Sequence, residues 1–214
     1  MSKADFIRLN TSVMCPPLVP EVKLHLAHEA VPLWQKTEEE LGEMGLPPPF
    51  WAFAWAGGQA LARYVLDHAE ALANRRVLDL ATGSGLVAIA AVQAGAASAI
   101  ATDIDAFAAT AAQMNADLNH VTLDIQLRDL LALPPPAVDA ILVGDLFYEK
   151  ALAGRCLAWL QQARAEGAAI FIGDPGRSYL PQGQLVKLAE YNVPVTRDLE
   201  DAEIKKTAVW QLRA

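Results

Sequence analysis

Residues 77–91 read VLDLATGSGLVAIAA, and the next apolar run, residues 99–103, reads AIATD. The pattern predicts a short buried strand, a glycine-rich turn and a helix. Gly83 and Gly85 allow positive φ and let the backbone approach a ligand, and the amide groups that open the helix point at that ligand. Asp103 closes the second run, where a carboxylate can bind ribose hydroxyls. The chain is therefore expected to bind a cofactor that contains a nucleoside.

The overall composition predicts one folded domain. The chain has 214 residues, of which 53% are hydrophobic and 20% are charged, which is enough for a substantial core. The net charge of −8 disfavours nucleic acid and anionic membranes as partners, because both need clustered Lys and Arg. We expect a cytoplasmic protein, because no apolar run reaches membrane-spanning length and no signal or transit pattern opens the sequence. Cys15 and Cys156 are typical of free thiols in a reducing compartment, although a disulfide between them stays open.

Strands and helices are expected to alternate along most of the chain. Strands are expected at Arg76–Ala81, Ala99–Thr102, Leu123–Leu127, Ala137–Val143 and Ala168–Ile172. Helices are expected at Gly58–His68, Ser84–Gln93, Ala106–Leu118 and Ala151–Ala165. Helices between strands imply right-handed crossovers and a parallel sheet. Two later strands, Val193–Asp198 and Thr207–Leu212, are expected to form an antiparallel pair at one edge of this sheet.

A helical N-terminal extension, residues 1–50, is expected to precede the α/β core, residues 51–214, within the single domain. Its segment Glu21–Met44 is charged and amphipathic, which predicts one or two helices. Three prolines at positions 47–49 end that pattern.

Four aspartates follow the expected strands at their carboxyl ends. They are Asp103, Asp129, Asp145 and Asp174. One such acid would mean little, because aspartate is common in turns and at helix N-caps. Ligands of an open α/β sheet bind outside the carboxyl ends of the strands, so four acids beside a glycine-rich turn indicate a binding site.

The glycine-rich turn fits two kinds of cofactor. Residues 83–88 match the G-x-G-x-x-A pattern of dinucleotide enzymes. Asp79 would oppose a bound pyrophosphate, but it could hold a cationic amino group. The late antiparallel pair also differs from a plain dinucleotide fold. S-adenosylmethionine carries an amino group, a ribose and a sulfonium cation without phosphate, so we favour it as the cofactor. The alternative for Asp79 is a buried acid that caps nearby amides.

An aromatic cluster, Phe50, Trp51, Phe53 and Trp55, precedes the first core strand. Aromatic rings can cover adenine and interact with a sulfonium. We expect Phe50 and Phe53 to pack in the core, and Trp55 to contact the cofactor. Asp129 is expected either near the adenine or at a helix N-cap.

Together these residues resemble the class I S-adenosylmethionine-dependent methyltransferases, and more narrowly the electron transfer flavoprotein beta-subunit lysine methyltransferase family in a bacterial-type form. The matching segments are residues 20–24, 49–67, 77–85, 101–105, 144–149 (GDLFYE), 172–177 (IGDPGR) and 207–210. The resemblance implies a Rossmann-like sheet of seven strands in the order 3-2-1-4-5-7-6, with helices on both faces and an antiparallel last strand. It also implies methylation of lysines on the flavoprotein beta subunit. Ala106 replaces a proline of the relatives, which should affect only the start of a helix.

The resemblance and the strand ends together predict the site residues. The expected cofactor-binding residues are Trp55, Gly57, Asp79, Gly83, Gly85, Asp103, Asp129 and Gly144. The expected substrate-binding residues are Phe147, Asp174 and Arg177. No metal ligands are expected, because the four histidines are scattered along the chain.

Three residues after the fourth strand are expected to act on the lysine. Asp145 would orient the amine and help it lose its proton, Tyr148 would form a pocket wall, and Glu149 would attract the lysine. The alternative for Asp145 is an acid that forms a turn, and the alternative for Tyr148 is a packed ring. The alternative for Glu149 is an acid in the first turn of a helix.

Three functions stay open on the sequence alone. The first is the flavoprotein lysine methyltransferase. The second is a methyltransferase for another protein, such as a ribosomal protein, or for a small molecule. The third is a nucleotide-binding module without catalysis.

Overall fold

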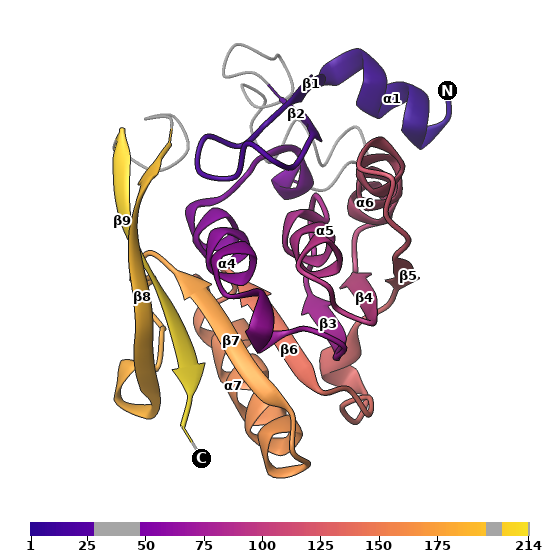
Figure 1. Cartoon of the computed structure of the whole chain (residues 1–214). Helices are drawn as coiled ribbons and strands as arrows, with labels where there is room; N and C mark the ends of the chain where they lie inside the picture. The colour runs from indigo at the N-terminus through magenta and orange to yellow at the C-terminus, as the bar shows by residue number, and fades with distance from the viewer. Residues whose placement is uncertain (28–47, 196–202, 214) are drawn as a thin grey trace.

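The structure is a computed structural model that describes residues 1–27, 48–195 and 203–213. The strands of its main sheet are β3 (Arg76–Leu80), β4 (Ser98–Asp103), β5 (Asp124–Leu127), β6 (Ala140–Gly144), β7 (Ala169–Asp174), β8 (Leu185–Pro194) and β9 (Ile204–Leu212). They lie in the order β5-β4-β3-β6-β7-β9-β8 (Figure 1). Strands β3 to β7 pair in parallel, and β9 runs antiparallel to β7 and β8. Counted from β3, this is the order 3-2-1-4-5-7-6, so the predicted fold is confirmed.

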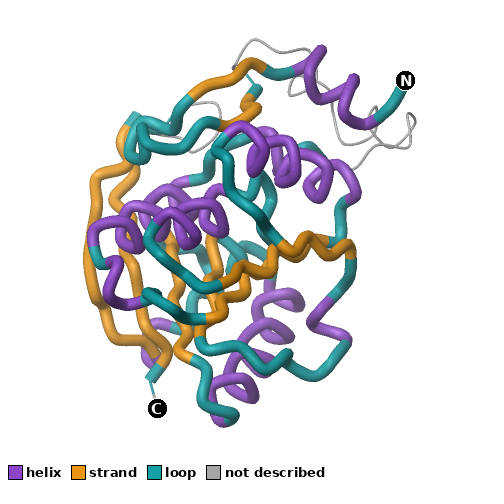
Figure 2. Tube along the Cα trace, turned by 45° about the vertical axis from the view of Figure 1, so that its right-hand side comes forward, coloured by secondary structure: helices purple, strands orange, loops and turns teal. Residues whose placement is uncertain are grey.

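Helices cover both faces of this sheet. The longer ones are α4 (Ala56–Asp67), α5 (Leu86–Gln93), α6 (Ala106–Leu118) and α7 (Lys150–Ala165), and the short 3-10 helices are η1 (Phe50–Ala52), η2 (Ala69–Ala71), η3 (Leu130–Ala132) and η4 (Gln182–Gln184). Helices α4, α5 and α6 lie on one face and α7 on the other (Figures 1 and 2). Alternate residues of β6 pack into these two layers: Ala140 and Leu142 into one, Ile141 and Val143 into the other, as the two-residue period of a strand requires.

Four glycines bring the start of α4 against the carboxyl ends of β6 and β7. A Cβ atom at Gly57 would overlap the carbonyl oxygen of Gly173, and one at Gly173 would overlap the carbonyl oxygen of Gly57. A Cβ atom at Gly144 would lie 3.1 Å from the Cα atom of Gly58. Only residues without a side chain allow backbones to come this close. Gly57 and Gly144, predicted to bind the cofactor, therefore also have a packing role.

The N-terminal extension is only partly helical. Helix α1 (Lys3–Asn10) begins with a capping box between Ser2 and Asp5. It is followed by two antiparallel strands, β1 (Ser12–Met14) and β2 (Leu24–Leu26). The prediction of helix from Glu21 onward is wrong over β2, because its two leucines are buried at the two-residue spacing of a strand. Residues 28–44 of that predicted helical segment lie outside the described residues.

Several element boundaries differ from those predicted. Helix α5 begins at Leu86, two residues later than expected, because Gly83 and Gly85 have φ values of 53° and 82°, which a right-handed helix does not allow. Strand β8 begins eight residues before the predicted Val193–Asp198, because it pairs with β9 from Leu185 opposite Leu212 to Pro194 opposite Ile204. Residues 196–198 of that prediction lie outside the described residues.

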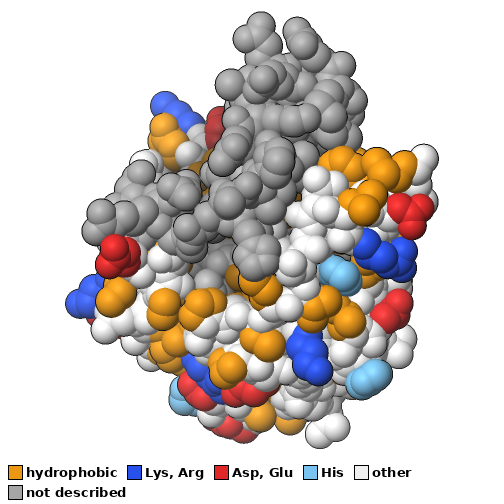
Figure 3. Space-filling model, turned by 90° about the horizontal axis from the view of Figure 1, so that it is seen from above, with side chains coloured by type: hydrophobic (Ala, Val, Ile, Leu, Met, Phe, Trp, Pro, Cys, Tyr) orange, Lys and Arg blue, Asp and Glu red, His pale blue; other side chains and the backbone are white. Residues whose placement is uncertain are grey.

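The described part of the chain shows no large basic patch on the face seen in Figure 3, where Lys and Arg side chains are separated by acidic and apolar ones. Cys15 is exposed and Cys156 is buried, and both are free thiols. None of the described helices has the length and apolar character needed to cross a membrane.

Candidate functional site

The glycine-rich turn links β3 to α5 and has two distinct halves. Gly85 is the N-cap of α5, and a Cβ atom there would lie 3.1 Å from the Cβ atom of Ala112 on α6. Gly83 is more open, because a Cβ atom there would meet only the Cα atom of Trp51, at 3.9 Å. Gly83 therefore leaves space for a ligand, whereas Gly85 allows close packing of α6.

Asp103 lies beside this turn, as predicted. Its Oδ2 atom accepts a hydrogen bond from the Gly83 amide at 2.9 Å, and its Oδ1 atom accepts one from the Asp105 amide at 3.0 Å. Burial raises the pKa of the Asp103 carboxyl above its ordinary value. The acid predicted to bind ribose is thus held at the end of β4 against the glycine-rich turn.

Asp79 is buried behind the same turn. Its Oδ2 atom accepts hydrogen bonds from the Thr82 hydroxyl at 2.5 Å and from the Ala88 amide at 3.0 Å. The bond from the Ala88 amide is the one expected if Asp79 is a buried acid that caps nearby amides. The partnership with Thr82 was not predicted from the sequence. The pKa of Asp79 is raised from 3.8 to about 7. Burial is the largest cause and the charge of Asp103 adds to it, whereas the hydrogen bonds from Thr82 and Ala88 act in the opposite direction.

These residues fit S-adenosylmethionine better than a phosphate-bearing cofactor. Asp79, Asp103 and Asp105 all lie around the glycine-rich turn, and burial raises the pKa of each. A cation favours the ionised form of such carboxyls, whereas a pyrophosphate would be repelled by it. Among the described residues, no group of His, Cys, Asp and Glu could hold a metal ion.

Binding of S-adenosylhomocysteine, which carries a cationic amino group, is expected to strengthen as pH rises through about 7. In the free protein the raised pKa of Asp79 means that its carboxyl is protonated below that pH. The same shift stabilises the folded protein at low pH, and this contribution is lost as pH rises from the ordinary pKa to about 7. Near pH 7, binding should release about half a proton. Calorimetry in buffers with different ionisation enthalpies measures that release.

The matched control for this measurement is Asp79→Asn, which keeps an oxygen that can accept from the Ala88 amide. It should remove most of the proton release. Equal release by the Asn variant would assign the titration to Asp103 or Asp105 instead.

A buried asparagine that the prediction missed joins the extension to the glycine-rich turn. Asn115 on α6 is fully buried. Its side chain accepts from the His25 amide of β2 at 2.7 Å and donates to the carbonyl oxygen of Ser84 at 2.8 Å. One turn later, Asn119 accepts from and donates to the backbone of Lys23, at 2.9 and 2.7 Å. Two asparagines four residues apart, at the end of an alanine-rich helix, were the available signal.

Asn115→Ala is expected to weaken S-adenosylhomocysteine binding about tenfold, because it leaves buried groups of the turn without a partner, a loss of about 1–3 kcal/mol. The matched control is Asn119→Ala, which loosens the same extension but has no bond to the turn. Its cofactor affinity should change little. Equal weakening in both variants, measured by calorimetry, would show that the extension as a whole, rather than the Ser84 bond, supports the site.

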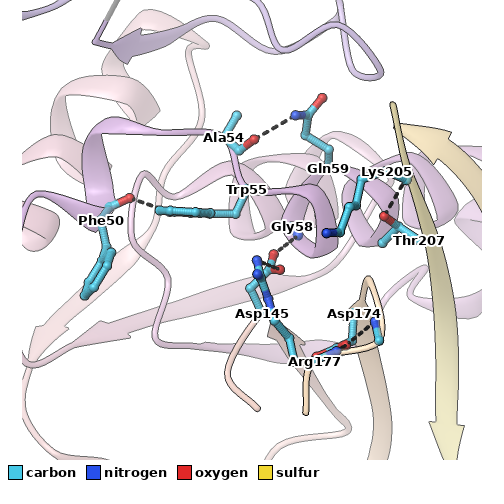
Figure 4. Close-up of polar contacts among 11 residues, drawn as sticks. Phe50, Ala54, Trp55, Gly58, Gln59, Asp145, Asp174, Arg177, Lys205 and Thr207 are labelled. Atoms are coloured by element: carbon cyan, nitrogen blue, oxygen red, sulfur yellow. Dashed lines mark hydrogen bonds and ion pairs between the residues drawn. The ribbon is translucent and has the colours of Figure 1, made fainter. Parts of the chain in front are cut away.

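The second half of the site lies at the ends of β6 and β7. Asp145 follows β6 with a φ of 55°, and its amide donates to the carbonyl oxygen of Gly173 at 3.0 Å. Its Oδ2 atom accepts from the Gly58 amide at 2.9 Å, and its Oδ1 atom accepts from Arg177 at 2.9 Å (Figure 4). The carboxylate is thereby fixed between the start of α4 and the loop after β7.

Asp174 contacts the backbone of Arg177, and Trp55 lies near its side chain. The Oδ1 atom of Asp174 accepts from the amides of Gly176 and Arg177, each at 2.7 Å, so the predicted turn sequence does form a turn. The Arg177 guanidinium lies 5.9 Å from the centroid of the Trp55 ring, and the indole N–H donates to the carbonyl oxygen of Phe50 at 2.9 Å. Trp55 and Arg177 thus lie beside Asp145 (Figure 4).

Two aromatic residues are placed differently from the prediction. Phe147 is fully buried and packs in the layer of α7, so the expectation of a substrate contact is corrected: the turn after β6 points this ring inward. Phe50 was expected in the core but is 47% exposed, with its ring 6.1 Å from the exposed Tyr148 ring. Phe53 is buried, as expected.

Two acids at the strand ends, Glu149 and Asp129, make the contacts of helix caps, which were the alternatives to a role in the site. Glu149 is the N-cap of α7 and accepts from the amides of Ala151 and Leu152, each at 2.8 Å; these bonds lower the pKa of its carboxyl. Asp129 caps η3 through the Leu131 amide at 3.0 Å and pairs with Arg155 at 2.9 Å. Both acids therefore stabilise element ends.

Comparisons with known proteins place this chain in a family. The model of the family "Ribosomal protein L11 methyltransferase (PrmA)" matches residues 59–144. The chain is 37% identical to the electron transfer flavoprotein beta subunit lysine methyltransferase of Danio rerio, over 97% of this chain and 82% of the relative. It is 35% identical to that of Xenopus laevis, over 96% and 85%. The magnesium protoporphyrin IX methyltransferase of Synechocystis PCC 6803, solved with bound SAM, shares the fold at a TM-score of 0.53 and 18% identity, over 74% of this chain and 80% of that one. The chain belongs to the family of electron transfer flavoprotein beta subunit lysine methyltransferases.

Proposed function

We propose that this protein methylates lysine side chains of the electron transfer flavoprotein beta subunit. As a member of its family, the chain is an S-adenosylmethionine-dependent protein-lysine methyltransferase. The observation that carries the choice of substrate is the identity of 37% over 97% of the chain to a relative named for that subunit. Family membership also favours an enzyme over a nucleotide-binding module without catalysis.

The two halves of the site suggest a division of labour. Bound S-adenosylmethionine supplies the methyl group on a sulfonium. Gly83 and Asp103 would hold its ribose, and the buried Asp79 would favour its positive charge. Asp145, Tyr148 and Arg177 lie at the neighbouring strand ends, where they would handle the lysine.

Asp145 would prepare the lysine for transfer. The lysine nitrogen must first lose a proton, because only the neutral amine has a free electron pair and its ordinary pKa is about 10.4. The Arg177 guanidinium and the Gly58 amide fix the Asp145 carboxylate, and carboxylate oxygens can accept more than these two hydrogen bonds. In the transfer, the carbon–nitrogen bond forms as the carbon–sulfur bond breaks, and the electron pair of the latter stays on sulfur. Positioning supplies much of the acceleration.

Mass spectrometry of the flavoprotein beta subunit after incubation with enzyme and S-adenosylmethionine tests this proposal. Methyl groups should appear on lysines of that subunit. An unmodified subunit after long incubation, with an enzyme that methylates other proteins in a cell extract, would contradict the substrate assignment.

A ribosomal protein is the second candidate substrate, because the family model that matches residues 59–144 is described by ribosomal protein L11. Labelling of a whole extract with radioactive methyl donor separates the two: the labelled band has either the size of the flavoprotein subunit or that of a ribosomal protein.

A cytoplasmic location is also part of this proposal. It is supported by the free thiols of Cys15 and Cys156, which are typical of a reducing compartment. Cell fractionation with an antibody to the protein tests it.

A further inference from the structure

Three half-exposed aromatic residues lie on the segments that border the proposed lysine side of the site. Phe50, Tyr148 and Tyr179 are 47%, 51% and 44% exposed. We call them the aromatic rim. Resting on the proposed function, we infer that the aromatic rim docks an apolar side chain that neighbours the target lysine in the protein substrate, and so selects which lysines are methylated.

Phe50 connects the aromatic rim to the Asp145 carboxylate. Its ring lies 6.1 Å from the Tyr148 ring and 6.0 Å from the Trp55 ring. Trp55 in turn lies against the Arg177 guanidinium, which binds Asp145 (Figure 4). The Phe50 ring is therefore connected to Asp145 through Trp55 and Arg177, at a distance that a residue near the lysine in the substrate chain can span.

Tyr179 belongs to the loop after β7, whose backbone reaches the segment that carries Tyr148. Its amide donates to the carbonyl oxygen of Phe147 at 3.2 Å, so its backbone adjoins the residue that precedes Tyr148. The Asp174 turn fixes the start of this loop. Both tyrosines are therefore carried by short, anchored segments after β6 and β7.

The chemistry of the rim fits a lysine with an apolar neighbour. Single exposed apolar residues are ordinary on a protein surface, but a cluster beside a binding site indicates contact with a partner. Burial, and then the negative charges of Glu149 and Asp103, raise the pKa of the Tyr148 hydroxyl. The rim therefore has negative charge near it, which suits the positive lysine. Aromatic side chains bury a large area while losing few rotamers, so they make effective anchors.

The experiment measures steady-state methylation of the flavoprotein beta subunit by Phe50→Ala and Tyr179→Ala enzymes. Each variant should raise the KM for the protein substrate about tenfold, the loss expected for part of one buried ring. The kcat and the affinity for S-adenosylhomocysteine should change less than about twofold. The matched control is Val186→Ala on the edge strand β8, which is 45% exposed and should leave the KM unchanged. Thermal unfolding checks that the variants are folded.

A double-mutant cycle identifies the occupant. In the substrate, the apolar residue next to the methylated lysine is replaced by serine, which should raise the KM for the wild-type enzyme but not further for Phe50→Ala. Additive effects, or an unchanged KM in both rim variants, would overturn the inference. A loss of cofactor affinity in Phe50→Ala would assign its ring to the cofactor instead. If the wild-type enzyme leaves the flavoprotein unmethylated, the proposed function fails first, and the same variants are then measured on the protein that the labelling identifies.

Discussion

Asp145→Asn is expected to lower the single-turnover rate of methyl transfer by a factor of about 10²–10⁴ near neutral pH. The aspartate side chain accepts from both the Arg177 guanidinium and the Gly58 amide. An asparagine keeps only one oxygen, so its NH2 group would face one of these two donors. The variant also loses the negative charge that orients the lysine ammonium. Rapid-quench measurement of methylated substrate gives the rate.

The pH dependence of the rate and the cofactor affinity distinguish a role of Asp145 at the lysine from a role in the cofactor site or in the turn. The Asn variant should recover part of its rate at higher pH, where neutral lysine is more abundant, while its affinity for S-adenosylhomocysteine stays close to that of the wild-type enzyme. If affinity and rate fall in proportion, Asp145 belongs to the cofactor site. A fully active variant would reduce Asp145 to a turn residue.

Gly173→Ala is expected to destabilise the protein by about 3 kcal/mol or more, the upper range for overpacking a well-packed contact. The new Cβ atom would overlap the carbonyl oxygen of Gly57 and lie 2.8 Å from the Cβ atom of Leu61. Relief would require α4 to move away from β7, and with it the Gly58 amide that binds Asp145. The free energy of unfolding in urea, measured beside the wild-type protein, gives the change.

Gly154→Ala on α7 is the matched control, because nothing lies within 4 Å of a Cβ atom at that position. It should be neutral or stabilise the helix by up to about 1 kcal/mol, since alanine favours a helix more than glycine does. A Gly173→Ala protein as stable as the wild type would show that α4 can shift at little cost.

The sequence by itself determined the glycine-rich turn, the buried strands around it and the acids at the strand ends. Each of these follows from local rules: the period of apolar residues, the freedom of glycine at positive φ and the place of aspartate after a strand. Helix α6 was even predicted with its observed bounds, Ala106–Leu118. The strand order and the lysine chemistry came from the resemblance of motifs such as GDLFYE.

Only the tertiary structure decided which of these residues meet. The Gly58 amide and the Asp145 carboxylate are 87 residues apart in sequence, and the Asn115 bond to Ser84 joins residues 31 apart. Phe50 was expected to be buried and is exposed, whereas Phe147 was expected at the substrate and is buried. Both differences also come from packing between distant segments. Local periodicity predicts whether a residue lies in a helix or a strand. Which distant residues it contacts depends on how the helices and strands pack together, and a short stretch of sequence does not contain that information.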